Sequence, residues 1–269
     1  MLPDAQISAV TLERIFTAEE AEAGARRALA ADIILTQDVR IARFGRLRTE
    51  VLKPLHSRLT LYPKVIFTGF HPDAVYVFEG AKALASPAGT YHSQILIAAF
   101  LAALPLEQAL GLFRAEVYER LGYFEEFRKA QVYLVKTGAA LGFDLHPKRQ
   151  RWRGDDPFMY TINHPKPRVM ASIGRQAFEQ LGLSPRPVDA EAIEDSLGRG
   201  VRLPVYPEIA ERLGVEGGFT FTNAIRDGRA SLSLEEFAAA SFDTYAGYRP
   251  EVLAAALRSG VAEVLGELA

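Results

Sequence analysis

Residues 33–36 read Ile33-Ile34-Leu35-Thr36, an apolar run that is typical of a strand buried on both faces of a parallel sheet. On its N-terminal side, residues 10–15 have a β-type composition. Thr17-Ala18-Glu19-Glu20 then has the pattern of a capping box, in which a hydroxyl and a carboxylate satisfy free backbone N–H groups. A helix is therefore expected to start after Thr17 and to reach about residue 29.

The residues after this run continue the alternation of strands and helices. Residues 40–55 are rich in arginine and amphipathic, which favours a helix, and Val65-Ile66-Phe67-Thr68-Gly69 is expected to form a third strand. A β-α-β-α-β order favours right-handed crossovers and a parallel sheet. We therefore predict an α/β fold with a small parallel sheet in the N-terminal third of the chain.

Beyond residue 90 the apolar residues recur at spacings of three and four, which predicts a predominantly helical remainder. Ser233-Leu234-Glu235-Glu236 is a second capping box. The Pro- and Gly-containing stretch 183–204 does not separate two obvious cores. We therefore expect a single α/β domain over residues 1–269, with a helical cap at about 90–150 and a helical C-terminal part. The expected helices are 94–103, 105–113, 123–141, 168–181, 234–245 and 251–268.

The composition excludes several classes of protein. The chain has 269 residues, of which 49% are hydrophobic, so it can bury a large core. The 31 Lys and Arg residues balance 33 Asp and Glu residues, which argues against a nucleic-acid-binding protein. The absence of cysteine excludes disulfides, zinc ribbons and a thiol nucleophile.

No secretory signal is visible, and the longest apolar stretch is shorter than the roughly 20 residues that cross a bilayer. We therefore expect a cytoplasmic protein without a membrane span.

Three of the five histidines lie in polar, turn-prone segments. His71 follows the third predicted strand, His92 directly precedes a predicted helix, and His164 stands before a proline. A histidine fixed beside a carboxylate can act as a general acid or base near neutral pH. The alternative for each is a structural ring that is hydrogen-bonded to the backbone. Because ligands of open α/β sheets bind beyond the carboxyl ends of strands, a shared site would include His71 and Gln37.

Ser93 has two interpretations. It could be a nucleophile activated by a neighbouring histidine and by the helix dipole, or it could be the N-cap of the helix that begins at Gln94. The G-x-S-x-G signature of acyl hydrolases is absent, so we favour the cap. Asp73, two residues after His71, could join the histidines in a metal site. No H-E-x-x-H or similar helical pair is present, however, and no metal is predicted.

A cationic loop is a candidate site for phosphates. The segment His146-Pro147-Lys148-Arg149-Gln150-Arg151-Trp152-Arg153-Gly154 contains four cations and the only tryptophan of the chain. Arg151-Trp152-Arg153 could bind phosphates by charge-assisted hydrogen bonds while the indole stacks on a base, and Lys166 and Arg168 would extend the positive surface. The alternative is a solvated loop whose tryptophan packs on the core. Because no Walker A sequence or G-x-G-x-x-G follows a strand, side chains would hold a phosphorylated ligand.

Several short motifs follow one another from about residue 30 to residue 245, and their joint order is more specific than any one of them. Together they resemble the WcbI family of capsular polysaccharide biosynthesis enzymes. The resemblance implies a coenzyme A binding protein that acts as an acyltransferase and acetylates a polysaccharide or its sugar precursor. It also implies an α/β fold similar to SGNH hydrolases, so the small sheet is expected to be SGNH- or flavodoxin-like. The motifs are Ala31-Asp32-Ile33-Ile34-Leu35-Thr36-Gln37, Gly69-Phe70-His71-Pro72-Asp73, Tyr91-His92-Ser93, Leu121-Gly122-Tyr123-Phe124, Phe158-Met159-Tyr160-Thr161-Ile162-Asn163-His164-Pro165-Lys166 and Pro204-Val205-Tyr206-Pro207-Glu208-Ile209-Ala210.

One feature of the family is missing from this sequence. Family members usually open with a strand that ends in Gly-Asn-Cys-Gln, whose cysteine is a candidate nucleophile, and the sequence has neither this motif nor room for its strand before Val10. We expect a truncated version, an internal start, or a lineage that works without that group. The site carried over from the family is therefore partial, and its pocket residues are His71, Tyr91, His92, Asn163 and His164.

Three functions compete on this basis. The first, which we favour, is an acyl-CoA-dependent O-acyltransferase. In it His164 removes a proton from a sugar hydroxyl, Asn163 or Tyr91 stabilises the oxyanion, and the loop from Arg151 to Arg153 holds the nucleotide end of coenzyme A. The second is a non-catalytic remnant that binds coenzyme A or a nucleotide. The third is an SGNH-like esterase that uses the serine before the helix or a metal.

Overall fold

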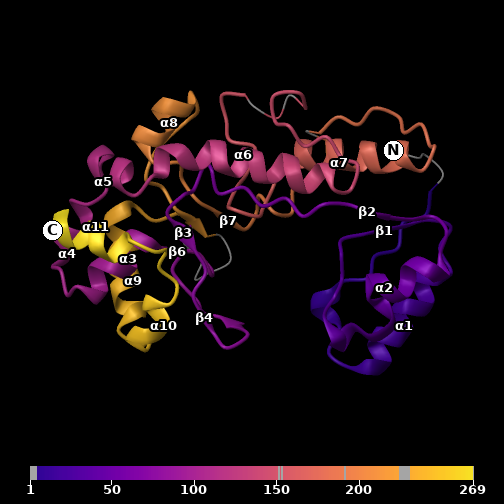
Figure 1. Cartoon of the computed structure of the whole chain (residues 1–269), viewed down its shortest axis with the longest axis horizontal. Helices are drawn as coiled ribbons and strands as arrows, with labels where there is room; N and C mark the ends of the chain where they lie inside the picture. The colour runs from indigo at the N-terminus through magenta and orange to yellow at the C-terminus, as the bar shows by residue number, and fades with distance from the viewer. Residues whose placement is uncertain (1–4, 151, 153, 191, 224–230, 269) are drawn as a thin grey trace. The chain divides into compact units, whose positions relative to one another are not determined.

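The structure is a computed structural model, and it describes residues 5–150, 152, 154–190, 192–223 and 231–268. The chain divides into two compact units (Figure 1). The first unit comprises the residues up to 64 together with 135–150 and 167–193. The second comprises 65–134, 151–166 and the residues from 194 onward. The single-domain organisation expected from the sequence stays a prediction.

The first unit contains the parallel strand pair. β1 (Ile34–Thr36) pairs in parallel with β2 (Leu59–Leu61). α1 (Ala18–Leu29) precedes β1 and begins with the predicted capping box: the Thr17 hydroxyl accepts from the Glu20 N–H at 3.1 Å, and the Glu20 carboxylate accepts from the Thr17 N–H at 2.9 Å. The mixed α/β class, with a small parallel sheet early in the chain, is therefore confirmed.

Three local predictions in the first unit are wrong. Residues 10–15 contain the 3₁₀ helix η1 (Leu12–Arg14) and not a strand. In place of one helix over 40–55, the chain forms three short ones. Arg48 has an extended backbone between the first two, and Gly45, with a φ of +50°, also interrupts the helical backbone inside the first. Leu35 of β1 is 36% exposed, so this strand is not buried on both faces. The short helices are η2 (Ala42–Leu47), α2 (Thr49–Leu52) and η3 (Lys53–Leu55).

The third strand predicted at residues 65–69 is also wrong, because this segment pairs with no strand. Val65 and Phe67 are buried. The N–H of Phe67 donates to the carbonyl of Ile162 at 2.8 Å, and its ring lies 4.8 Å from that of Phe158 and 5.0 Å from that of Phe127. Packing of alternate side chains thus accounts for the strand-like pattern. The partner that β1 does have, β2, is only three residues long and gave too little pattern to be recognised.

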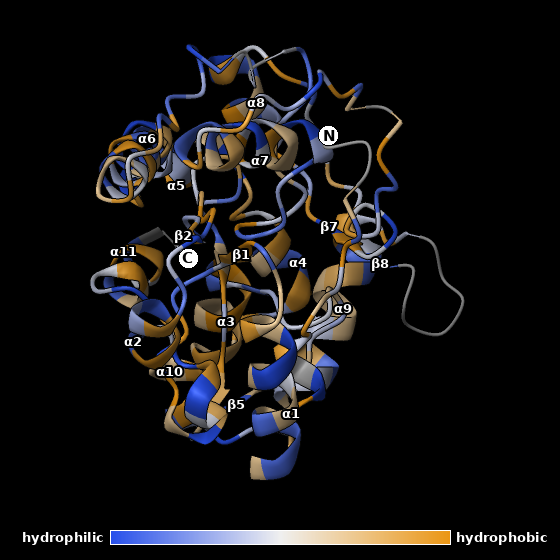
Figure 2. Cartoon of the chain, turned by 90° about the vertical axis from the view of Figure 1, so that its right-hand side faces the viewer, coloured by the Kyte–Doolittle hydropathy of each residue, from blue (hydrophilic) through white to orange (hydrophobic). Residues whose placement is uncertain are grey.

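The second unit is mainly helical, as predicted. α3 is apolar after its first residue, Gln94, and it is buried against α9, α10 and α11 (Figure 2). α9 has the predicted bounds and starts at the Ser233 capping box. The helix predicted at 251–268 is divided in two before Gly260, which has a φ of +82°. The helices are α3 (Gln94–Leu101), α4 (Leu106–Leu110), α5 (Ala115–Arg120), α8 (Pro207–Leu213), α9 (Leu234–Tyr245), α10 (Pro250–Ala254) and α11 (Val261–Leu268). Of these, α5 and α8 were not predicted.

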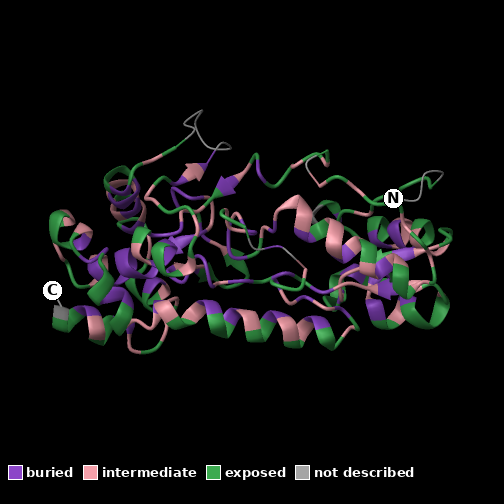
Figure 3. Cartoon of the chain, turned by 90° about the horizontal axis from the view of Figure 1, so that it is seen from above, coloured by how far each residue is buried: buried purple, intermediate pink, exposed green. Residues whose placement is uncertain are grey.

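Two long amphipathic helices complete the chain. α6 (Tyr123–Ala139) runs from the second unit into the first, and α7 (Pro167–Gln180) belongs to the first. Along α6 the buried positions recur every three or four residues, at Tyr123, Phe127, Ala130 and Leu134, with exposed residues between them (Figure 3). Within the described residues, no helix has both the length and the apolar character that crossing a bilayer requires.

Short antiparallel pairs fix the loops of the second unit. β3 (Ala74–Val75) pairs with β6 (His92–Ser93), β4 (Phe78–Glu79) with β5 (Lys82–Ala83), and β7 (Val201–Arg202) with β8 (Thr222–Asn223). In the first pair Ala74 lies opposite Ser93 and Val75 opposite His92. This register holds the residues after the 65–69 segment against the start of α3.

Candidate functional site

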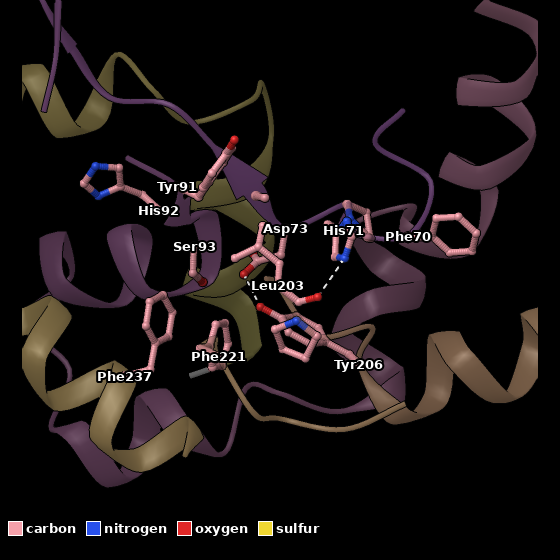
Figure 4. Close-up of a pocket in the computed structure, with 13 residues that line it drawn as sticks. Phe70, His71, Asp73, Tyr91, His92, Ser93, Leu203, Tyr206, Phe221 and Phe237 are labelled. Atoms are coloured by element: carbon pink, nitrogen blue, oxygen red, sulfur yellow. Dashed lines mark hydrogen bonds between the residues drawn. The ribbon is translucent and has the colours of Figure 1, made fainter. Parts of the chain in front are cut away.

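A small pocket lies in the second unit, next to the start of α3. It is lined by 13 residues and has a volume of about 20 Å³ (Figure 4). Residues of the β3–β6 pair form part of its wall, and the segment around 203–206 forms another part. The polar lining side chains are His71, Asp73, Tyr91, His92, Ser93 and Tyr206, and the apolar ones are Phe70, Pro72, Ala74, Leu203, Pro204, Phe221 and Phe237.

Asp73 is the polar centre of this pocket. Its Oδ1 accepts from the Tyr123 hydroxyl at 2.8 Å and from the Ile95 N–H at 3.0 Å, and its Oδ2 accepts from the Tyr206 hydroxyl at 2.7 Å. The buried carboxylate lies at the N-terminal end of α3, where the helix dipole favours its negative charge. Burial, together with the charge of Asp73, raises the pKa values of Tyr123 and Tyr206 well above their usual range. Both phenols therefore stay protonated and donate to the carboxylate.

His71 is held in the pocket by the backbone. Its Nε2 lies 3.0 Å from the carbonyl oxygen of Leu203, and because a carbonyl only accepts, Nε2 carries the proton. Nδ1 is then a buried acceptor without a hydrogen-bond partner. Burial lowers the pKa of His71 to about 4, so the ring is neutral at pH 7. His71, which was predicted as a possible base, therefore lies in the pocket. Its Nε2 makes the structural hydrogen bond to the backbone that was the alternative interpretation.

His92 has the same hydrogen-bonding pattern in a more enclosed place. Its Nε2 donates to the carbonyl of Leu84 at 3.2 Å, and its ring stacks on Tyr245 with 5.6 Å between the ring centres. Burial lowers the pKa of His92 to about 4. In Figure 4 its ring points away from His71 and Tyr206. This arrangement matches the structural interpretation of His92.

Tyr91, Asn163 and His164 are brought together although they are far apart in the sequence. The Tyr91 hydroxyl donates to Asn163 Oδ1 at 2.6 Å, accepts from the Thr161 hydroxyl at 3.0 Å, and lies 3.5 Å from His164 Nε2. Thr161 Oγ1 also accepts from the N–H of His164 at 3.2 Å, which fixes the turn. Burial lowers the pKa of His164 and raises that of Tyr91. A neutral imidazole therefore lies beside a protonated phenol.

Ser93 is the N-cap of α3, as the favoured interpretation predicted. Its hydroxyl accepts from the N–H of Leu96 at 3.1 Å. The N–H of Gln94 donates to the carbonyl of Asp73 and the N–H of Ile95 to its carboxylate, both at 3.0 Å. The first three N–H groups of the helix are thus already bonded, so this helix end offers no oxyanion hole for a serine nucleophile.

The cationic loop is only partly described. Arg151 and Arg153 lie outside the described residues. Trp152 is 1% exposed and packs on Phe158. Its indole therefore presents no face on which a base could stack. The structure matches the alternative interpretation, in which the tryptophan packs on the core. The Lys166 ammonium forms an ion pair with Asp156 and lies 5.1 Å from the ring centre of Tyr160.

Two predicted ligand-binding residues belong to the first unit. Gln37 follows β1 and is partly buried, and Arg168 lies in the first turn of α7. The other predicted residues that the structure describes belong to the second unit: His71, Tyr91, His92, Trp152, Asn163, His164 and Lys166. Across the part of the chain that the structure describes, no group of three His, Cys, Asp or Glu residues is arranged to hold a metal ion.

Comparison with known proteins assigns the chain to a family. The family model of WcbI, a polysaccharide biosynthesis enzyme, matches residues 1–186. The chain belongs to the WcbI family. A solved structure of WcbI, described as a novel polysaccharide biosynthesis enzyme, aligns with a TM-score of 0.64 over 94% of this chain and 83% of that one, at 13% sequence identity. That protein is described as native and without a disulfide bond between CoA and one of its cysteines. At this identity the likeness shows a shared fold. No curated protein matches the sequence significantly.

Part of the pocket lies beyond the stretch that matches the WcbI family model. Leu203, Tyr206, Phe221 and Phe237 all follow residue 186, and none was identified from the sequence as a site residue. Tyr206 lies in the Pro204-Val205-Tyr206-Pro207 motif, which was a usable signal. Phe221 and Phe237 are single aromatic residues in unremarkable surroundings, and only the fold brings them to the pocket.

Proposed function

We propose that this WcbI-family chain is an acyl-CoA-dependent O-acyltransferase that acetylates a sugar of a capsular polysaccharide or exopolysaccharide. The observation that carries the proposal is the contact of Tyr91 with both Asn163 and His164. A base, His164, and an amide that can donate to an oxyanion, that of Asn163, are gathered there beside the phenol of Tyr91, and acyl transfer to a hydroxyl requires both. Membership of a family of polysaccharide biosynthesis enzymes supports a sugar as acceptor.

The second unit contains cations suited to the phosphates of coenzyme A. Lys166 and Arg202 each place their charge 5.1 Å from the ring centre of Tyr160, and Lys166 follows His164 by two residues. Guanidinium and ammonium groups bind phosphate oxygens by charge-assisted hydrogen bonds. We therefore assign Lys166 and Arg202 to the anionic end of the ligand. The sequence-based assignments of Gln37 and Arg168, which belong to the first unit, and of Arg151 and Arg153, which lie outside the described residues, stay predictions. Bound acyl-CoA would supply the activated acyl group.

The residues of the site have distinct roles in this proposal. His164 is neutral at pH 7, because burial lowers its pKa, and so it has a lone pair that can take the proton of a sugar hydroxyl. Tyr91 orients the imidazole from 3.5 Å. Asn163 Oδ1 already accepts from Tyr91, which leaves its amide N–H groups to donate to a developing oxyanion. His71 positions the segment around Leu203, and its unpartnered Nδ1 is a second candidate base.

Two measurements on the full chain test this proposal. The first is thermal unfolding with millimolar coenzyme A, which should raise the midpoint because a ligand that binds only the native state stabilises it. The second is acetyl-CoA consumption with sugar acceptors by wild type, by His164→Asn and by the matched control His56→Asn. We expect His164→Asn to lower kcat about 100-fold or more while coenzyme A still binds. His56→Asn should keep wild-type turnover, because His56 belongs to the first unit and its Nε2 bonds to the Ala31 carbonyl there.

The outcomes separate the competing functions. No thermal shift with coenzyme A refutes the binding proposal. A shift without turnover identifies a non-catalytic binding protein.

We also propose a cytoplasmic location, where coenzyme A esters are available, and an SGNH- or flavodoxin-like topology. The parallel β1–β2 pair supports this topology.

A further inference from the structure

The pocket beside α3 has little polarity left to offer a ligand. Asp73 is occupied by two phenols and one backbone N–H, and the hydroxyl of Ser93 caps the helix. The Tyr206 hydroxyl donates to Asp73, and the Tyr91 hydroxyl donates to Asn163. These groups satisfy one another, and among the lining side chains Nδ1 of His71 and Nδ1 of His92 are left without a hydrogen-bond partner. A sugar, whose hydroxyls need several partners each, therefore does not suit this pocket, whereas an apolar group does.

The size of the pocket sets a second limit. Its volume of about 20 Å³ is close to what one water molecule needs. A methyl group is about as large as a water molecule, so the pocket matches the methyl end of an acetyl group. A chain longer by two or more carbons would have to displace the surrounding side chains, and protein interiors resist such overpacking.

Two stacked phenylalanines form part of the pocket wall. The rings of Phe221 and Phe237 are nearly parallel, with 3.9 Å between their centres, and both are buried. Phe237 is fixed by α9, and Phe221 is fixed by backbone hydrogen bonds of 2.8 and 2.9 Å with Leu232. The pair is therefore held from two segments and cannot easily move aside. Tyr91, whose hydroxyl reaches His164, lines the same pocket.

We propose that this pocket holds the acyl group of the donor, and that Phe221 and Phe237 limit it to acetyl. The inference rests on the proposed acyltransferase function and deepens it, because it names the residues that select the acyl group. Both residues lie outside the stretch that matches the WcbI family model, so acyl selection belongs to the C-terminal part of this chain.

Binding of a series of acyl-CoA esters tests the proposal without requiring turnover. Calorimetry on the full-length wild type should show that acetyl-CoA binds at least as tightly as free coenzyme A, and that butyryl-CoA and hexanoyl-CoA bind about tenfold more weakly. Phe237→Leu should restore butyryl-CoA to within about threefold of acetyl-CoA. Ala74→Val, which adds two methyl groups to the lining, should weaken acetyl-CoA relative to free coenzyme A. Phe242→Leu, on the same helix but outside the pocket, is the matched control and should behave as wild type.

Each result bears on one proposal or on both. Equal affinity for all chain lengths in the wild type overturns the acyl pocket and leaves coenzyme A binding intact. An equal effect of Phe237→Leu and Phe242→Leu overturns it too, because the effect would then be general to α9. The chain-length preference without any transfer to sugars supports the pocket and refutes the transferase. Failure of every acyl-CoA to bind overturns both. If Phe237→Leu does not fold, the prediction for Ala74→Val decides.

Discussion

The hydroxyl of Tyr91 donates to Asn163 Oδ1 at 2.6 Å across 72 residues of sequence. Tyr91 directly precedes β6, and Asn163 belongs to the turn that also carries His164. Thr161 donates to the same phenol oxygen, so two hydroxyls and an amide form a short chain of hydrogen bonds beside the imidazole. Such a chain fixes the orientation of a base before any substrate binds.

Removing this hydroxyl should affect turnover more than folding. In Tyr91→Phe, Asn163 and Thr161 each lose a partner, and we expect the free energy of unfolding to fall by about 1 kcal/mol. We expect kcat for acetyl transfer to fall about tenfold or more with KM for acetyl-CoA little changed, because orientation of the base is lost. Tyr62→Phe, a half-buried tyrosine of the first unit, is the control. A rise in KM at constant kcat would contradict a positioning role.

The two buried histidines, His71 and His92, predict an acid-sensitive native state. Burial lowers the pKa values of His71 and His92 from 6.5 to about 4, so between these pH values the unfolded chain binds protons that the native chain does not. Stability is therefore constant above pH 6.5 as far as these groups are concerned, and it falls as the pH drops from 6.5 towards 4. Each histidine contributes a loss on the order of 3 kcal/mol over this range.

Denaturant unfolding at pH 7.0, 5.5 and 4.5 measures this loss. His71→Gln keeps a side-chain N–H for the Leu203 carbonyl and removes the titration, so its stability should depend less steeply on pH than that of the wild type. His56→Gln serves as the control because its ring lies in the first unit. An unchanged slope in His71→Gln would show that this ring is protonated without cost in the folded chain.

Ser93 is expected to matter for stability and not for chemistry. Ser93→Ala removes the cap of α3 and should lower the free energy of unfolding by about 1 kcal/mol. Ser93→Gly should lower it by less, because glycine is a better N-cap residue than alanine. Ser233→Ala, which removes the equivalent cap of α9, provides the matched control. Acetyl transfer and ester hydrolysis should persist in Ser93→Ala once the folded fraction is matched. Loss of ester turnover in that variant alone would favour the serine esterase.

Local signals in the sequence predicted the helices well and the sheet poorly. Capping boxes at Thr17 and Ser233 act within one turn, so they can be read without the rest of the fold, and both are present. The apolar pattern at residues 65–69 indicates that side chains are buried, but it does not show whether a neighbouring strand buries them. Here the burial comes from aromatic packing around Phe67. The grouping of Tyr91 with Asn163 and His164 followed from the family resemblance. Phe221 and Phe237 could not be predicted, because a contact between distant segments leaves no local pattern.

Asp73 should be the most sensitive single position of the pocket. Its two oxygens accept three hydrogen bonds, from Tyr123, Tyr206 and the N–H of Ile95, and none of these donors has solvent as a substitute. Asp73→Asn keeps the shape but turns one acceptor into a donor, which leaves at least one buried hydroxyl without an acceptor. We expect the free energy of unfolding to fall by about 2 to 4 kcal/mol. The exposed Asp243→Asn should change it by less than about 0.5 kcal/mol.

The ultraviolet titration of the tyrosines provides a second measurement of the same network. In the wild type the pKa values of Tyr123 and Tyr206 lie well above the usual range because of burial first and the charge of Asp73 second. Asp73→Asn removes the charge and one acceptor but leaves both phenols buried, so they should still resist ionisation at pH 11 as long as the protein is folded. A variant that is as stable as the wild type would mean that the phenols find other acceptors. Asp73 would then be replaceable, and the pocket would not depend on it.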